Sequence, residues 1–154
     1  MSDADNTIIT KIKRKGDSLI EIHTERELAK GRGIDARVLK CTDEPYPSFS
    51  KAMDALEVAV RSLLEILPEQ WDRALGVSGV SFSETGNDGE GVVITSQVTI
   101  AGSENPLVLN TPMLPVAHLA ETAQEALKKV RTEAAAYLKG KRRGDLFAPA
   151  QKAA

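Results

Sequence analysis

The stretch DEPYPSFSKAMDALEVAVRSLLEIL, residues 43–67, divides the chain and indicates its fold class. Its two prolines exclude both a continuous helix and a central strand at the start of the stretch. Ser48 follows them, and its hydroxyl is suited to accept a hydrogen bond from the backbone N–H groups that begin a helix. Residues 49–67 then carry apolar side chains at intervals of three and four, with charged side chains between them. We therefore expect a long amphipathic helix here.

Three strand-like segments precede this helix. Residues 7–14 and 18–25 alternate apolar and polar side chains on either side of the turn at residues 15–17, which predicts a hairpin. Residues 27–33 contain two glycines and mixed charge, so they are expected to form a loop. Residues 34–42 alternate again and predict a third strand.

A second hairpin is expected after the helix, formed by residues 75–83 and 91–101 around a glycine-rich turn. Three small residues in its first strand, Ser78, Gly79 and Ser81, let another backbone or a helix come close.

A second long helix is predicted over residues 116–139, with an alanine-rich apolar stripe. Thr111 and Pro115 are suitable start signals, and Gly140 is a suitable stop.

The predicted order is thus β-β-β-α-β-β-α. This order indicates an α+β fold with a mainly antiparallel sheet of about five strands and two long amphipathic helices. An additional short strand at residues 107–109 is a further interpretation. We expect a single domain over residues 1–139, followed by a basic, loosely ordered tail over residues 140–154.

Composition restricts the function. The chain has 154 residues, of which 42% are hydrophobic, and its longest apolar runs are far shorter than the roughly 20 residues that cross a bilayer. The polar, acidic N-terminus and the single cysteine predict a cytoplasmic location. Cys41, His23 and His118 do not form a metal-binding or nucleophilic motif, and glycine-rich phosphate-binding patterns are missing. We therefore expect a protein that is not an enzyme and that uses neither a cofactor nor a metal.

Charge is unevenly distributed along the chain. The net charge is −2, yet the last 16 residues carry five basic side chains and one acid. Lys141, Arg142 and Arg143 in this tail are candidate contacts for single-stranded DNA. The basic cluster within residues 11–15 is either a further phosphate contact or an edge strand protected by charge. The acidic body argues against a protein dedicated to duplex binding.

The segment SENPLVLNTPMLP, residues 103–115, is either a connecting loop packed on the core or a loop that lines a ligand site. Asn110 can hydrogen-bond to the local backbone or to a ligand. Thr111 and Pro112 are expected to open the last helix, whose exposed N–H groups favour an anion.

Four segments together, DEPYPSF, VSGVSFS, GEGVVIT and NPLVLNTP, resemble a family of short, mostly uncharacterised bacteriophage proteins. The similarity covers about residues 43–115. Members of this family are associated with early-region genes near replication and recombination functions. The resemblance implies a phage or prophage origin, and hence the cytoplasm of a host cell. It assigns no activity to any residue.

Two functions remain open. The first is a non-catalytic, homo-oligomeric binding protein that sequesters a small nucleotide of host immune signalling, in the manner of anti-defence proteins. Arg37, Tyr46, Asn110 and Thr111 are its candidate ligand contacts, as a cation, a stacking ring and two polar groups. The second is an accessory protein of phage replication or recombination that binds single-stranded DNA or a protein partner.

Overall fold

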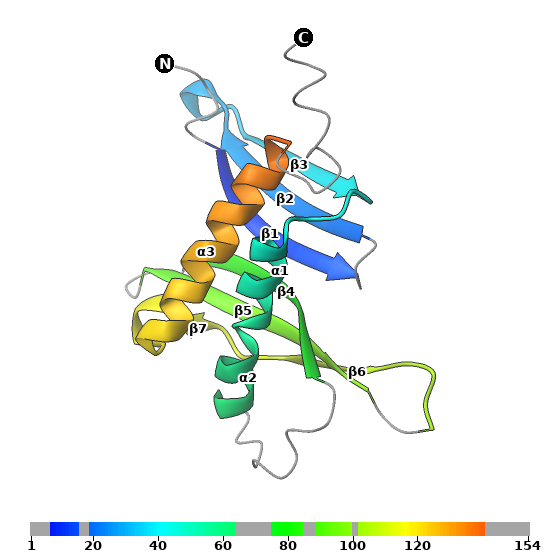
Figure 1. The fold of residues 1–154 in the computed structure, drawn as a ribbon. Helices are drawn as coiled ribbons and strands as arrows, with labels where there is room; N and C mark the ends of the chain where they lie inside the picture. Colours follow the sequence, from blue (N-terminus) through cyan, green and yellow to red (C-terminus); the bar gives the residue numbers. More distant parts are fainter. Residues whose placement is uncertain (1–6, 16–18, 64–74, 85–88, 100–101, 141–154) are drawn as a thin grey trace.

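The computed structural model describes residues 7–15, 19–63, 75–84, 89–99 and 102–140. Its centre is a seven-stranded antiparallel sheet with the order β3-β2-β1-β4-β5-β6, in which β7 also pairs with β5. The strands are β1 (Thr7–Lys15), β2 (Leu19–Glu27), β3 (Ile34–Cys41), β4 (Leu75–Glu84), β5 (Glu90–Val98), β6 (Leu107–Asn110) and β7 (Leu114–Pro115). Helices α1 (Pro47–Asp54), α2 (Glu57–Leu63) and α3 (Glu121–Leu138) lie against one face of this sheet (Figure 1).

The predicted α+β architecture is confirmed, with more strands than expected. The short apolar segment at residues 107–109 does form a strand, because β6 pairs with β5 through Val98↔Leu107 to Thr95↔Asn110. The pairing of β7 with β5 was not predicted. Two-residue strands leave no periodicity for a sequence pattern to detect.

The first helix is bent, and it begins differently from the prediction. Pro47 occupies its first turn, where a missing N–H costs nothing, so the cap residue is Tyr46. The capping role expected of Ser48 is therefore wrong, and its hydroxyl instead donates a hydrogen bond to Glu133 of α3 at 2.6 Å. The helix breaks between α1 and α2, at residues 55–56. Leu67 and Pro68 lie outside the described residues.

The last helix also begins later than expected, at Glu121. Between β7 and α3 the chain forms a 3₁₀ turn, Val116–His118, and then two extended residues. The expectation that Thr111 and Pro112 open the helix is therefore wrong, and the N–H groups that begin the helix lie about ten residues further along the chain. The predicted apolar stripe is confirmed, because six residues of α3 are buried: Ala123, Ala126, Leu127, Val130, Ala134 and Tyr137.

The core lies between the helices and the sheet. Ile12, Ile22, Val80 and Ile94 are fully or almost fully buried on the side of the sheet that faces the helices. Tyr137 of α3 closes one end of this core: its ring meets that of Phe49 edge-on at 5.9 Å, and its hydroxyl donates to the backbone carbonyl of Asp43 at 2.6 Å. No helix in the described part of the chain is long and apolar enough to cross a membrane.

Strand β1 lies in the middle of the sheet, between β2 and β4, so the prediction that its basic cluster protects a sheet edge is wrong. Arg14 from that cluster faces the helices and joins two elements. Its guanidinium donates to the Val77 carbonyl at 2.8 Å and pairs with Asp54 of α1 at 2.5 Å. The predicted close approach at Gly79 is confirmed, because a Cβ atom there would lie 3.1 Å from the Ile12 carbonyl oxygen.

Candidate binding cleft

Strands β1 and β4 separate along part of their length. They pair only where Lys11–Lys13 face Gly79–Ser81. A β-bulge between Ile9 and Lys11 then shifts the register with β2. As a result, the side chain of Ile8 lies on the open face of the sheet, which is the face opposite the helices, and is 60% exposed. Beyond the bulge, residues 7–10 have no strand partner on the β4 side among the described residues. The sheet therefore opens between two neighbouring strands.

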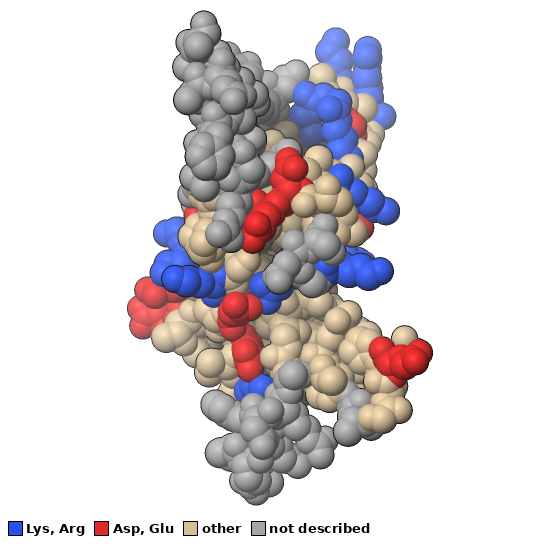
Figure 2. All heavy atoms as spheres, turned by 45° about the vertical axis from the view of Figure 1, so that its right-hand side comes forward, with Lys and Arg blue, Asp and Glu red and all other residues tan. Residues whose placement is uncertain are grey.

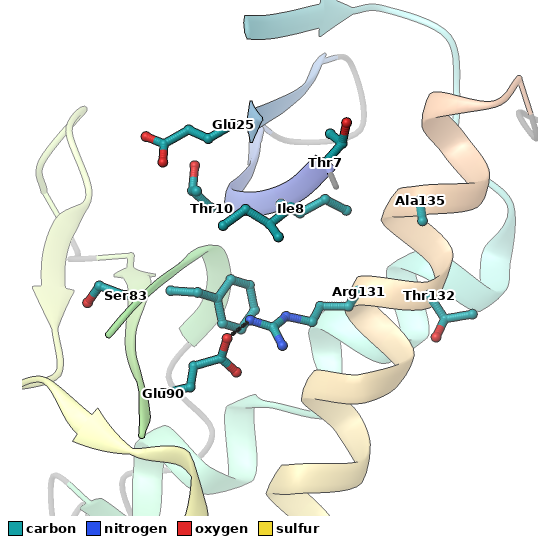
Figure 3. Close-up of a pocket in the computed structure, with 11 residues that line it drawn as sticks. Thr7, Ile8, Thr10, Glu25, Ser83, Glu90, Arg131, Thr132 and Ala135 are labelled. Carbon is teal, nitrogen blue, oxygen red and sulfur yellow. Dashed lines mark hydrogen bonds and ion pairs between the residues drawn. The ribbon is translucent and has the colours of Figure 1, made fainter. Parts of the chain in front are cut away.

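The resulting opening, here called the β1–β4 cleft, has a volume of about 710 Å³. Its walls come from four parts of the fold: the first half of β1, Glu25 of β2, the end of β4 with the start of β5, and α3 from Arg131 to Ala135 (Figure 3). Its polar lining consists of Thr7, Thr10, Glu25, Ser83, Glu90, Arg131 and Thr132. Concave sites with a few convergent polar groups are the usual form of small-molecule sites.

One arginine organises the wall formed by α3. The guanidinium carbon of Arg131 lies 3.8 Å from the centre of the Phe82 ring, which is a cation–π contact. The same guanidinium forms an ion pair with Glu90 of β5 (Figure 3). Both charged side chains are 37% exposed, so solvent or a ligand reaches them. A planar cation is thus held by a ring on one side and a carboxylate at its edge.

The charge of the cleft is low. Arg131 is its one cation among the described residues, and Glu90 and Glu25 are its two carboxylates. Glu25 stands on the β2 side of the opening, away from the Arg131–Glu90 pair (Figure 3). Such a lining offers no cluster of cations for a polyphosphate.

The sheet face opposite the helices carries charges of both signs. The register places Lys40, Glu21 and Lys13 side by side on three adjacent strands. His23 Nε2 lies 2.5 Å from a carboxylate oxygen of Glu21. This hydrogen bond lowers the pKa of Glu21 from its ordinary 4.5, against the effect of burial, and the positive charges of His23, Lys13 and Lys40 lower it further. Basic and acidic side chains also mix on the face shown in Figure 2.

Two of the four ligand contacts proposed from sequence, Arg37 and Asn110, lie on opposite edges of the sheet. Arg37 is on the edge strand β3, exposed and paired with Asp35 at 3.1 Å. Asn110 is on β6, at the opposite edge of the sheet, where its side-chain oxygen accepts a hydrogen bond from Thr95 at 2.7 Å. Tyr46 caps α1. A pocket that uses both edges needs more than one subunit, so this site stays a prediction.

Thr111 is buried and belongs to the sheet. Its backbone N–H donates to the Ile94 carbonyl, and its hydroxyl oxygen accepts from the Ile94 N–H, both at 3.0 Å. These two hydrogen bonds continue the pairing of β6 with β5 beyond Asn110. They also occupy the backbone N–H and the hydroxyl oxygen of Thr111, through which it would contact a ligand.

Sequence reasoning missed the residues of the β1–β4 cleft. Phe82 is buried in the core, but its partner Arg131 is 49 positions away in the sequence and has no motif around it. The cleft depends on the bulge in β1, which the alternating pattern does not reveal. The alternative nucleic-acid contacts, Lys141, Arg142 and Arg143, lie outside the described residues.

In the described part of the chain, no three His, Cys, Asp or Glu side chains gather as a metal site. Comparison with protein-family models, with curated proteins and with solved structures found no match to this chain.

Proposed function

We propose that this protein is a non-catalytic binding protein whose ligand is a small molecule with a planar ring, held in the β1–β4 cleft. The observation that carries the proposal is the Arg131 guanidinium, stacked on Phe82 in the wall of a cavity of about 710 Å³. Small-molecule sites typically have volumes of about 300–1,000 Å³. One face of the guanidinium covers Phe82, and the Arg131 side chain is still 37% exposed, so a second planar group can stack on it as nucleobases commonly stack on arginine.

The charges of the cleft narrow the ligand class. A single cation already paired with Glu90, together with Glu25, disfavours a triphosphate. The hydroxyl groups of Thr10 and Thr132 already donate to the carbonyls of His23 and Lys128, so their oxygens can accept hydrogen bonds from a sugar or from the edge of a base. The hydroxyl of Thr7 also lines the cleft. A nucleoside or a cyclic nucleotide fits this lining better than a linear polyphosphate. Sequestration of a nucleotide signal in a phage-infected cell is the biological role that we attach to this binding, and it rests on the phage resemblance.

The test is thermal unfolding of the full chain with adenosine, guanosine, their cyclic monophosphates and ATP. A ligand at 100 times its dissociation constant stabilises the folded state by about 2.7 kcal/mol. For a chain of this size, each kcal/mol raises Tm by about 2–4 °C, so the shift is readily measured. We expect a shift with a nucleoside or a cyclic nucleotide and a smaller one with ATP.

Two matched variants locate the site. Arg131→Lys keeps the charge but removes the planar group, so it should abolish the shift. Arg14→Lys makes the same change in another ion pair, with Asp54, outside the cleft, and should keep the shift. Equal shifts in both variants would place the ligand elsewhere, and the lack of any shift in the wild-type protein would refute the proposal.

A second candidate is binding of single-stranded DNA. Lysines 11, 13 and 40 on the open face of the sheet favour it, since a basic surface attracts phosphate. Phe49, Phe82 and Tyr137 disfavour it, because these rings are buried in the core and cannot stack on bases. Under this candidate, DNA binding weakens steeply with salt and weakens further when Lys141, Arg142 and Arg143 are neutralised.

A further inference from the structure

The two edges of the sheet differ in how they are protected. Strand β6 at one edge has four residues and is bounded by Pro106 and Pro112, which cannot donate a backbone hydrogen bond to a neighbouring strand. Strand β3 at the other edge has eight residues and contains no proline. All eight pair with β2 in an unbroken register from Ile20↔Cys41 to Glu27↔Ile34, so no bulge bends this edge away.

The β3 edge also exposes apolar side chains. Ile34 is 59% exposed and Val38 is 51% exposed, and Ala36 between them is exposed on the same face of the strand. Among the described residues, β3 has β2 as its single strand partner. A long, regular edge with exposed β-branched residues is a ready template for another strand.

The sequence of β3 is complementary to itself in one antiparallel register. We propose that β3 pairs with β3 of a second copy of this chain, with Ala36 opposite Ala36 of the partner subunit. Asp35 then lies opposite Arg37 of the partner subunit, and the two-fold axis repeats this pair. On the other face, Ile34 lies opposite Val38 of the partner subunit. At the centre of the interface, acidic side chains thus lie opposite basic ones and apolar side chains lie opposite apolar ones.

Neighbouring registers lack this match. A shift by two residues toward the end of the strand places Arg37 opposite Arg37 of the partner subunit, and like charges directly opposite each other are destabilising. A shift by one residue puts the helix-covered face of one subunit beside the open face of the other. In the proposed register the two sheets become one, and the helices of both subunits lie on the same side. This interface does not depend on the β1–β4 cleft or its ligand.

Light scattering coupled to gel filtration of the full chain measures the assembly. We expect twice the 16.6 kDa mass of one chain. Val38→Lys should weaken the dimer about tenfold or more, because it replaces an apolar contact by a charge at each of two symmetric positions. Val108→Lys is the matched control: Val108 is also 51% exposed, but it lies on β6, and its substitution should leave the mass unchanged.

Charge exchange tests the register. Arg37→Asp alone and Asp35→Arg alone should each give monomers, because like charges then face each other across the interface. An equimolar mixture of the two variants should form a heterodimer, and the double variant Asp35→Arg, Arg37→Asp should form a homodimer again. Circular dichroism checks that each variant is folded. A monomeric wild-type chain at its highest attainable concentration would overturn the proposal, as would a dimer that Val38→Lys leaves intact or charge exchange that fails to restore pairing.

Discussion

Replacing Thr111 by valine should destabilise the fold without changing the shape of the buried side chain. The hydroxyl oxygen of Thr111 accepts the backbone N–H of Ile94 at 3.0 Å, and Thr111 is buried. Valine removes the acceptor, so a buried N–H group loses its hydrogen bond, at a cost of about 1–3 kcal/mol. At about 2 kcal/mol, Tm should fall by about 4–8 °C. Thr111→Ser keeps the acceptor and should lose much less.

Urea unfolding followed by circular dichroism gives the free energy of unfolding of each variant, at one fixed protein concentration because association also stabilises the fold. Thr95→Val is the matched control. The Thr95 hydroxyl donates to Asn110 at 2.7 Å at an exposed position, where water replaces the lost partner, so the expected change is within about 0.5 kcal/mol. If Thr111→Val lowers the free energy of unfolding no more than Thr95→Val does, the hydroxyl of Thr111 does not stabilise the sheet. That result would favour the prediction from sequence that Thr111 contacts a ligand.

Three further predictions concern stability. Gly79→Ala should destabilise the protein by about 1 kcal/mol or more, since its Cβ atom meets the backbone of β1 at 3.1 Å, whereas Gly76→Ala, with open space around it, should be neutral or slightly stabilising in the same urea titration. Ser96→Ala should be neutral or stabilising in thermal unfolding, because the buried Ser96 hydroxyl has no hydrogen-bond partner within the described structure. The pKa of Glu21 is lowered in the folded state, so its contribution to the free energy of unfolding is fully present above the unfolded pKa of about 4.5 and is lost as the pH falls through the folded pKa. Glu21→Gln should therefore flatten the acid side of the curve of stability against pH. An unchanged curve would show that the contact with His23 does not stabilise the fold.

Periodicity predicted the main elements because burial in this fold follows regular stripes. Met53 and Val60 in the first helical region and Val130 in α3 lie where intervals of three and four place them. The bend at residues 55–56 was not predicted, because no proline or glycine marks it and the apolar stripe continues across it. Leu63 was expected in that stripe and is 41% exposed.

The candidate site was less accessible to sequence reasoning than the fold. A cleft between neighbouring strands arises where their pairing stops, and pairing depends on the relative position of β1 and β4, more than 60 residues apart. The alternation over residues 7–14 predicts Ile8 and Ile12 on one face of the strand, but the bulge between them turns Ile8 to the face opposite the helices. The same bulge separates residues 7–10 from β4. One irregularity thus accounts both for the misplaced isoleucine and for the unforeseen cleft.

The order in which the elements occur along the chain affects synthesis on the ribosome. Among the described residues, all the strands precede α3, yet Tyr137 near the end of α3 donates a hydrogen bond to the carbonyl of Asp43, 94 positions earlier in the chain. Until this helix emerges, the nascent sheet keeps part of its apolar face uncovered, which is the condition under which chains aggregate or recruit chaperones. A chain that ends before residue 121 therefore keeps every described strand but lacks the helix that covers the core, so we expect proteases to degrade it faster than the full chain.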